Sequence, residues 1–321
     1  MKRPLVIIAY NRPEYFEPVL KSLQPQVGDD RKVLMFLDGV RRHFGKEFEE
    51  ADQKGVTECK RLFEYYLPNG ECIESNKNLG VAFNQLRARE TVFQDYEEAI
   101  FLEDDAVLEP YYVQQLDRLM DFFKDDPRVG MVNCFGEGHR DKELYDWYPY
   151  IKRDEGSAEK TTSYLEQQMN KDRFKGMDHL WAYGFYRRAY EKVKETMKGY
   201  YDLIPGHEYR ARPHEQIMQF WRNQGSSSNI VSSQDSGTAT ALILNDFVKV
   251  STYTNNFTYI GVWGEHSRPD NFDNAGWNDC ITYDKEQSDF IWDDETFDCI
   301  SSRLKNKYTA ERAYESFRLD L

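Results

Sequence analysis

The stretch Ala99-Ile100-Phe101-Leu102-Glu103-Asp104-Asp105 joins an apolar run directly to three consecutive carboxylates. Four apolar residues in succession are typical of a strand that is buried on both faces of a parallel sheet. Ligands of open α/β sheets bind beyond the carboxyl ends of the strands, so this order of residues predicts an acidic ligand-binding edge. Because side chains alternate along a strand, we expect Glu103 and Asp105 to face one way and Asp104 the other.

Three neighbouring carboxylates repel one another, and the repulsion raises their pKa values unless a cation shares the site. Mn²⁺ and Mg²⁺ prefer oxygen ligands, so a hard divalent ion is the expected cation. The alternative interpretation is a solvated acidic turn, which the apolar strand in front of the carboxylates disfavours. We therefore predict a metal site at the end of this strand.

Short apolar runs alternate with helical patterns through the first half of the chain. This alternation predicts an α/β fold with an open, mostly parallel sheet flanked by helices. Asn11 is expected to cap the first helix, which ends at Leu23. The strands are expected at Leu5–Ala9, Val33–Leu37, Glu71–Glu74 and Ala99–Glu103, and a second helix at Asn78–Phe93.

The second half of the chain is less regular. Residues 136–178 are polar and aromatic and predict a long loop, which in a compact domain is usually functional or mobile. No clear linker is present, so we predict one domain over residues 1–270, with halves at 1–110 and 111–270, and a C-terminal appendage at 271–321. The expected elements are helices at Tyr111–Phe123, Arg187–Met197 and Glu215–Arg222 and a strand at Val129–Cys134.

The overall charge restricts the partners of the protein. Its 42 Lys and Arg against 56 Asp and Glu give a net charge of −14, and the pI is about 5.0. Surfaces that bind nucleic acid are usually basic, so nucleic acid is not an expected partner. The apolar run Leu5–Ala9 is too short for a signal peptide or a membrane span. The five scattered cysteines form no CxxC pair and are expected to be free thiols, so we expect a cytoplasmic protein.

Glycine-rich phosphate-binding motifs are absent from the sequence. Neither GxGxxG nor GxxxxGK[ST] occurs, which disfavours Rossmann dehydrogenases and P-loop enzymes. A phosphate ligand would therefore be bound in another way. A divalent ion held by Asp105 would bridge a diphosphate and stabilise it as a leaving group.

Four motifs, taken in order, resemble those of GT-A-fold glycosyltransferases, and most of all N-acetylglucosaminyltransferase I and its bacterial relatives. They correspond to the family's opening strand and turn, its second strand ending in Asp, its N-x-G segment and its DxD-type metal motif. The resemblance covers residues 4–135 and implies sugar transfer from a nucleotide-diphosphate donor, with UDP as the favoured nucleotide. The four motifs are Pro4–Pro13, Leu37–Gly39, Asn76–Asn84 and Glu103–Asp105.

The resemblance also implies which residues bind the donor. Asp38 would lie near the base, and Glu103 or Asp104 would approach the ribose or the sugar. On the residues alone, Asp38 is equally a turn residue before Gly39 and Asn78 a helix cap, and these interpretations stay open. The implied donor-binding residues are Tyr10, Asn11, Arg12, Asp38, Asn78, Glu103 and Asp104.

The metal ligands follow from the same resemblance. Asp105 would bind Mn²⁺, or Mg²⁺, directly. The segment Asn255–His266 resembles the N-x-G-x-x-G-x-H end piece of bacterial members, with insertions, which implies His266 as a further ligand. A single His is often structural, but Gly261 and Gly264 suit a loop whose backbone approaches a ligand closely.

An inverting sugar transfer needs a carboxylate that takes the proton of the acceptor hydroxyl. The family's base lies in an acidic helix-start segment, which the resemblance places at Glu215. Asp178 is the rival, and a residue outside both segments stays open. Glu215 is equally explained as a first-turn carboxylate stabilised by the helix dipole. The segment Gly176–Trp181 resembles the family's acceptor-side loop, which implies that Trp181 and Tyr183 stack on the acceptor, a glycan or glycoconjugate.

Two other classes of protein are compatible with parts of this pattern. A non-catalytic sugar- or nucleotide-binding protein of the same fold would suit the 15% aromatic content, but the intact Glu103–Asp105 motif speaks against it. A nucleotidyltransferase also uses a carboxylate-held metal. It would need a basic or glycine-rich grip on a triphosphate, for which Arg12 is the only obvious candidate near the first strand.

Overall fold

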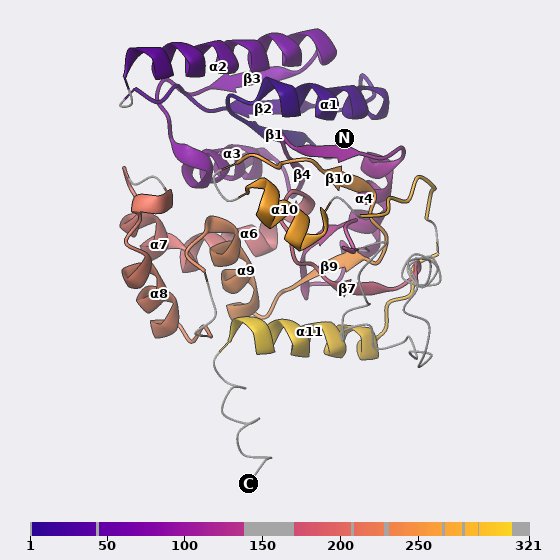
Figure 1. Cartoon of the computed structure of the whole chain (residues 1–321). Helices are drawn as coiled ribbons and strands as arrows, with labels where there is room; N and C mark the ends of the chain where they lie inside the picture. Colours follow the sequence, from indigo (N-terminus) through magenta and orange to yellow (C-terminus); the bar gives the residue numbers. More distant parts are fainter. Residues whose placement is uncertain are drawn as a thin grey trace.

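The computed structural model describes residues 2–42, 45–137, 170–206, 209–227, 231–264, 267–277, 280–287 and 289–309. Within them, an eight-stranded sheet has the order β3-β2-β1-β4-β8-β6-β9-β7, and β10 and β5 form a small second sheet (Figure 1). The strands are β1 Leu5–Ala9, β2 Val33–Leu37, β3 Glu71–Glu74, β4 Glu98–Glu103, β5 Ala106–Leu108, β6 Val129–Asn133, β7 Phe174–Gly176, β8 Ala182–Tyr186, β9 Val248–Thr252 and β10 Phe257–Tyr259.

Every residue of β1, β2, β6, β8 and β9 is buried, so both faces of these strands are covered by other elements. The strands β3, β2, β1 and β4 run parallel to one another, and so do β6 and β9. Strand β8 is antiparallel to both β4 and β6, and β7 is antiparallel to β9. The predicted fold class, an open mostly parallel α/β sheet flanked by helices, is confirmed. The helices are α1 Pro13–Leu23, α2 Lys46–Tyr66, α3 Gly80–Asp95, α4 Tyr112–Phe123, α6 Arg187–Thr196, α7 Lys198–Leu203, α8 His214–Asn223, α9 Gln234–Leu244, α10 Pro269–Ala275 and α11 Asp294–Tyr308.

The register of the first strands brings the predicted motifs to one edge of the sheet. Ala9 pairs with Leu37 across β1 and β2, and Ile8 pairs with Glu103 across β1 and β4. Since these strands are parallel, the residues that follow them emerge side by side. The antiparallel β8 begins at the same edge, where the Glu103 N–H donates to the Trp181 carbonyl at 2.8 Å.

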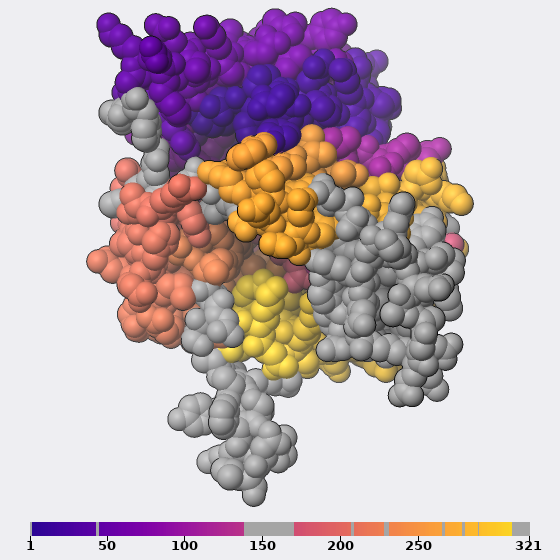
Figure 2. All heavy atoms as spheres, viewed as in Figure 1, coloured from indigo at the N-terminus to yellow at the C-terminus, as the bar shows by residue number. Residues whose placement is uncertain are grey.

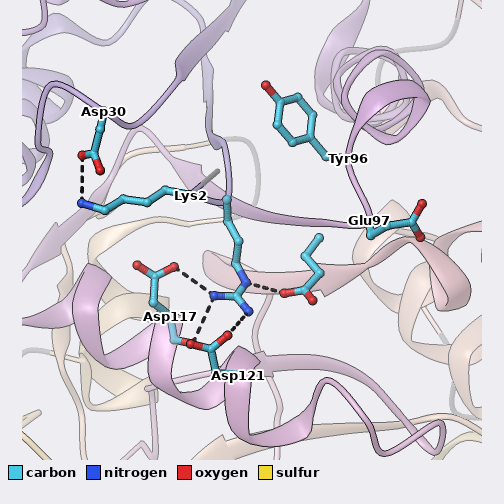
Figure 3. A pocket seen from close by; sticks show the side chains of 8 residues that line it. Lys2, Asp30, Tyr96, Glu97, Asp117 and Asp121 are labelled. Carbon is cyan, nitrogen blue, oxygen red and sulfur yellow. Dashed lines mark hydrogen bonds and ion pairs between the residues drawn. The ribbon is translucent and has the colours of Figure 1, made fainter.

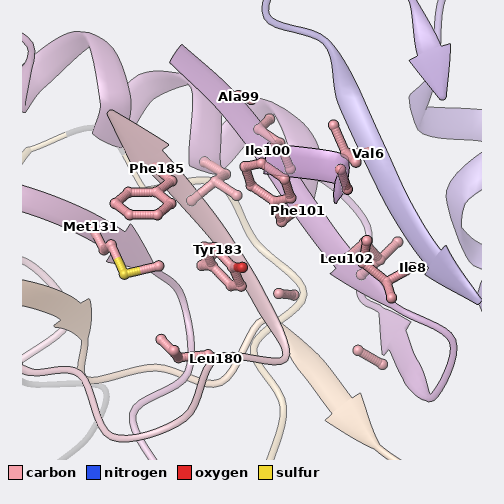
Figure 4. Close-up of a cluster of buried hydrophobic side chains, with 14 of the residues drawn as sticks. Val6, Ile8, Ala99, Ile100, Phe101, Leu102, Met131, Leu180, Tyr183 and Phe185 are labelled. Carbon is pink, nitrogen blue, oxygen red and sulfur yellow. The ribbon is translucent and has the colours of Figure 1, made fainter. Parts of the chain in front are cut away.

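The hydrophobic core extends across the junction between the two halves of the sheet. Figure 4 shows Phe101 of β4 beside Tyr183 and Phe185 of β8, all buried. The Phe101 and Tyr183 rings are stacked with their centroids 5.4 Å apart. This packing joins the parallel N-terminal strands to the antiparallel part of the sheet and fixes the position of β8 against the acidic end of β4.

The starts of the first two predicted helices differ from the structure. Arg12, not Asn11, is the N-cap of α1, and no side chain caps that helix. The Asn11 amide instead donates to Asp52 of α2. Helix α3 begins at Gly80, and the Asn78 amide donates to the Gly39 carbonyl at 2.8 Å. In both cases a polar side chain at a strand end binds a neighbouring segment rather than its own helix.

The described part of the predicted C-terminal appendage packs against the sheet. Helix α11 contacts β7, β9 and α9, and Figure 1 shows it running across the sheet below β7. Ile300, Leu304 and Tyr308 are buried in the main hydrophobic core. Asp293 caps the helix by accepting the Thr296 N–H at 2.8 Å. A domain boundary at residue 270 stays a prediction. No helix in the described ranges is long and apolar enough to span a membrane.

Replacing Leu304 with Ala should lower the free energy of unfolding by about 2–5 kcal/mol, the usual cost of truncating a buried leucine. Its Cδ2 atom lies close to the backbone of Gly176 in β7, so the cavity would open at the sheet itself. The exposed Cys299 on the same helix provides the control, because Cys299→Ala should stay within about 0.5 kcal/mol of wild type. Urea titration measures both. Equal values for the two variants would mean that α11 is a detachable appendage.

Candidate functional site

The three predicted carboxylates lie together where β4 ends. Glu103 is the last residue of β4, and Asp104 and Asp105 form the turn that leads into β5. The Arg12 guanidinium contacts Asp104 Oδ1 and lies 2.9 Å from Asp105 Oδ2. The expectation that Asp104 points away from Asp105 is wrong. Side-chain alternation stops at Glu103, and the turn directs both aspartates to the same arginine.

Asp105 has the chemistry of a metal ligand. Burial raises the pKa of its carboxyl to about 6, with Arg12 opposing the shift and Asp104 adding to it. Its Oδ1 atom is buried and accepts no hydrogen bond from any described residue. An unpaired buried carboxylate oxygen is costly, and a divalent cation is a partner that would satisfy it. The residues present therefore fit Mn²⁺ or Mg²⁺.

The protein would supply only part of the coordination shell. Over the described ranges, no group of three or more His, Cys, Asp or Glu side chains is arranged to hold a metal ion. Mg²⁺-type sites commonly use one or two carboxylates and complete the shell with water and substrate phosphates. Asp105 fits that pattern. His266, the other predicted ligand, lies outside the described residues.

A fourth carboxylate, Asp235, interacts electrostatically with Glu103 and was not predicted. It lies in the first turn of α9, which Ser233 caps by accepting the Ser236 N–H at 3.2 Å. Its Oδ1 atom is buried and, within the described part of the chain, has no hydrogen-bond partner. Burial raises the pKa of Asp235, while Arg89 is the strongest of the groups that oppose the shift.

Glu103 and Asp235 form an electrostatically coupled pair. Burial raises the pKa of Glu103 well above its usual value, and Asp235 is its most strongly interacting charged neighbour. The Gln85 amide donates to Glu103 Oε1 at 2.8 Å. Arg89, which is itself buried, donates to Gln85 Oε1 at 3.1 Å. Carboxyl groups with raised pKa values in one cluster are typical of catalytic sites.

Asp38 is saturated by hydrogen bonds from the protein. Its Oδ1 atom accepts the N–H groups of Gly39 and Leu79, each at 2.8 Å. Its Oδ2 atom accepts the Gly80 N–H at 2.9 Å and the Asn78 amide at 3.2 Å. A carboxylate offers about four acceptor positions, so Asp38 fastens the end of β2 to the start of α3. Direct contact between Asp38 and a nucleotide base stays a prediction.

Tyr10 and Asn11 are held by a buried aspartate that the sequence did not reveal. Asp52 of α2 accepts the Tyr10 hydroxyl and the Asn11 amide, and it also accepts the Arg41 N–H at 2.8 Å. The Arg41 guanidinium lies over the Tyr10 ring, 5.6 Å from its centroid. This network fixes the shape of the loop that follows β1 and leaves the Tyr10 ring partly exposed beside Arg41.

The two predicted bases pair with cations that are not part of the carboxylate cluster. The Glu215 side chain is 95% exposed on α8, and its carboxylate lies 4.0 Å from Arg222 of the same helix. Asp178 contacts Lys307 at 2.9 Å and Arg303 at 3.5 Å, both from α11. Burial opposes the charge of Asp178, but the surrounding cations outweigh it and hold its pKa well below the usual range. Such a carboxylate is a weak general base near neutral pH.

The predicted acceptor residues pack in two different aromatic groups, Trp181 with Tyr259 and Tyr183 with Phe101. The Trp181 ring is stacked between Tyr259, at 3.8 Å between centroids, and His179, at 4.1 Å. Both faces of the indole are therefore covered, and its edge meets Trp277 at 5.2 Å. Tyr183 is 2% exposed, and its hydroxyl accepts a hydrogen bond from Arg89 at 2.7 Å. Neither ring presents a free face to a sugar in this conformation.

A late segment of the chain covers the carboxylates. Strand β10 pairs with β5, and the Ile260 N–H donates to the Asp105 carbonyl at 2.9 Å. A Cβ atom on Gly261 would overlap Asp105 Oδ2, so the close approach of this backbone requires glycine. Trp263 follows and is 59% exposed, and its backbone N–H donates to the Tyr15 hydroxyl at 3.0 Å. In Figure 2 the orange segment that contains these residues lies directly below the indigo N-terminal part.

A separate hollow of about 690 Å³ lies at the opposite edge of the sheet, where β1 and β4 begin (Figure 3). Arg3 dominates it and contacts Glu98, Asp121 at 2.6 Å and Asp117 at 3.4 Å. Lys2 pairs with Asp30 at 2.8 Å. Arg31 and Arg187 from outside the lining pair with its Asp117 and Glu97, so each acidic side chain of the hollow already has a cationic partner. The amino ends of parallel strands are also not where such sheets bind ligands. The candidate site is therefore the carboxylate cluster at the carboxyl edge.

No family model and no curated protein matches this chain. Solved structures do. The mannosyltransferase PcManGT from Pyrobaculum calidifontis, in complex with GDP-Man and Mn²⁺, is 15% identical with a TM-score of 0.38, over 78% of this chain and 55% of that one. Residues 1–349 of S. aureus TarS are 10% identical with a TM-score of 0.42, over 80% of this chain and 60% of that one.

The bifunctional glycosyltransferase WbbM in its apo form is 10% identical with a TM-score of 0.38, over 95% of this chain and 51% of that one. This chain thus spans less than two thirds of each of these three structures. At such identities and TM-scores below 0.5, the similarities carry no conclusion about activity. A functional assignment has to rest on the site.

Proposed function

We propose that this protein is a metal-dependent glycosyltransferase. It transfers a sugar from a nucleotide-diphosphate donor, with UDP as the favoured nucleotide, to a hydroxyl of a glycan or glycoconjugate. The observation that supports this most is the carboxylate cluster at the carboxyl edge of the sheet, in which Asp105 Oδ1 is buried without a hydrogen-bond partner among the described residues. The motifs that resemble N-acetylglucosaminyltransferase I converge on that same edge through the register of β1, β2 and β4.

On the donor side, Asp105 would hold Mn²⁺ or Mg²⁺, which would neutralise the charge that develops on the leaving diphosphate. Arg12 lies 2.9 Å from Asp105 and would contact a phosphate. Asp38 and Asp52 keep the strand-end loops in place through their hydrogen bonds. Gly261 lets the covering segment lie directly on Asp105, which limits the access of water to the site.

On the acceptor side, we propose Asp235 as the general base. It interacts electrostatically with Glu103, and its buried Oδ1 atom has no hydrogen-bond partner among the described residues and can accept a proton. Burial moves its pKa towards neutrality, where a general base works best. Attack from that side, opposite the leaving diphosphate, would invert the anomeric centre. Glu215 and Asp178 stay as the alternatives that the sequence motifs suggested.

A panel of UDP-, GDP-, CMP- and dTDP-sugars tests the proposal by thermal shift, with and without Mn²⁺. One nucleotide should raise the unfolding midpoint in the presence of Mn²⁺ only, because ligands that bind the folded state alone stabilise it. A matched series with the free nucleotides shows whether the sugar contributes. If no nucleotide shifts the midpoint in the presence of metal, the donor site proposed here is wrong.

A non-catalytic binding protein of the same fold is the second candidate. One observation favours it: Arg12 pairs with both Asp104 and Asp105, as a purely structural counter-ion would. The two functions differ in a single assay, the slow hydrolysis of the bound donor in the absence of acceptor. A glycosyltransferase releases nucleoside diphosphate over hours in the presence of Mn²⁺, whereas a binding protein leaves the donor intact.

A further inference from the structure

The Arg12 side chain lies where a metal ion would approach the aspartates. Its Nη2 atom contacts Asp104 Oδ1 and lies 2.9 Å from Asp105 Oδ2, so one nitrogen bridges the two carboxylates. Both aspartate side chains are only 5% exposed, whereas that of Arg12 is 27% exposed. The arginine therefore forms the solvent-side wall of the cluster, and a cation from solution reaches the carboxylates past it.

The surroundings of Arg12 allow it to bind an anion instead. Its guanidinium carbon lies 5.4 Å from the centroid of the Tyr15 ring, and the Gly264 backbone runs beside its Nη1 atom. The planar guanidinium can donate several hydrogen bonds at once, and it uses Nη2 for both aspartates. Its other donors have no carboxylate partner in the described residues. A diphosphate at the mouth of the site would meet these donors directly.

We propose that Arg12 is a built-in counter-cation which competes with the divalent metal for Asp104 and Asp105, and which the diphosphate of the donor releases. This inference rests on the proposed function. Two cations that share the same buried oxygens repel each other strongly, because the surrounding dielectric is low. Metal binding to the free protein is therefore weak. When a nucleoside diphosphate binds, Arg12 turns to its phosphates, the carboxylates become available, and metal and nucleotide bind cooperatively.

The competition is measured by Mn²⁺ titration followed by electron paramagnetic resonance, first without nucleotide. Arg12→Gln should bind Mn²⁺ at least about tenfold more tightly than wild type, because the competing charge is gone while the aspartates are intact. Arg118→Gln is the matched control: it removes the same charge from a surface pair with Glu286, 2.8 Å apart, and should leave Mn²⁺ affinity within about twofold of wild type. Equal or weaker Mn²⁺ binding by Arg12→Gln overturns the proposal.

The same titration with UDP tests the cooperativity. UDP should raise the Mn²⁺ affinity of wild type by more than about tenfold, and by a clearly smaller factor in Arg12→Gln, because no internal cation is left to displace. Equal enhancement in both proteins contradicts the exchange. If Arg12→Gln does not fold, Arg12→Lys replaces it, because an ammonium bridges the two carboxylates less well and Mn²⁺ binding should tighten. Affinity at or below that of wild type then overturns the proposal.

Failure of this inference is distinguishable from failure of the proposed function. Suppose that wild type binds Mn²⁺ with UDP, that Asp105→Asn does not, and that Arg12→Gln binds Mn²⁺ as wild type does. The metal site then stands and only the exchange is wrong. If no nucleotide of the panel supports Mn²⁺ binding, the metal-dependent donor site itself is wrong. Both readouts are binding measurements and need no acceptor.

Discussion

Replacing Asp235 with Asn should lower kcat for sugar transfer by about 10²–10⁴-fold, the range expected for loss of a general base. The substitution keeps the shape of the side chain and removes its ability to take a proton. The affinity for donor and Mn²⁺ should change little, since Arg12 and Asp105 remain in place. Transfer is followed under single-turnover conditions with the donor identified by thermal shift.

Two matched variants show whether the effect belongs to Asp235. Glu215→Gln should stay within about threefold of wild type, because its side chain is 95% exposed and pairs only loosely with Arg222, at 4.0 Å. Asp178→Asn should reduce stability rather than kcat, since it removes the partner of Lys307 and Arg303 in a buried ion network. A large loss of kcat in Glu215→Gln together with a near-normal Asp235→Asn would move the base to Glu215.

Asp105→Asn should abolish metal-dependent donor binding. Loss of a residue that hydrogen-bonds to a metal ligand typically lowers metal affinity by about 10–100-fold, so loss of the ligand itself should lower it by at least about 100-fold. The variant also leaves the Arg12 guanidinium with Asp104 alone. The prediction is that Mn²⁺ no longer raises the unfolding midpoint with any nucleotide sugar and that donor hydrolysis falls to background.

Asp30→Asn is the control for this experiment. Asp30 is exposed and pairs with Lys2 in the hollow at the opposite edge of the sheet, so the variant makes the same change in charge away from the site. It should retain donor binding and hydrolysis. An Asp105→Asn protein that still binds donor in a Mn²⁺-dependent way would show that the metal is held elsewhere in the chain.

Three strands of the parallel half, β1, β2 and β4, could be predicted because they contain continuous apolar runs, whereas β3 is a mixed Glu-Cys-Ile-Glu segment that is not fully buried. The predicted bounds of β1, β2 and β3 agree with the structure, and that of β4 differs by one residue. Parallel strands of this kind are buried on both faces, so composition alone marks them. Their carboxyl ends then place Glu103, Asp104 and Asp105 at one edge, and this part of the site follows from the sequence.

The second half of the site could not be found in this way. Helix α9 is buried nearly all round, including the polar Thr238 and Thr240, so it shows no amphipathic stripe. The Ser233 cap and the acidic Asp235 after it were the only local signals of its start. Strand β8 is interrupted by Gly184, which packs against Met120, and has no clear apolar run. Asp235 therefore reaches the cluster through tertiary packing that local patterns do not encode.

The hydrogen-bond partners of polar side chains could not be predicted from the sequence either. Asn11 has the sequence context of a helix cap, but its side-chain amide donates a hydrogen bond to Asp52, 41 residues away. Asp38 has the context of a turn, and it accepts hydrogen bonds from the start of α3. A cap and a tertiary hydrogen bond use the same residue types, so only the packing of α2 and α3 against the strand ends decides between them.

The most direct test of the central claim is a crystal structure of the protein with Mn²⁺ and the nucleoside diphosphate that the thermal-shift panel selects, with the metal located by its anomalous signal. We predict a single Mn²⁺ peak within coordination distance of Asp105 Oδ1, with the diphosphate bound to it and Arg12 turned from the aspartates to a phosphate. A nucleotide bound away from the end of β4, or bound there with no metal on Asp105, would contradict the account.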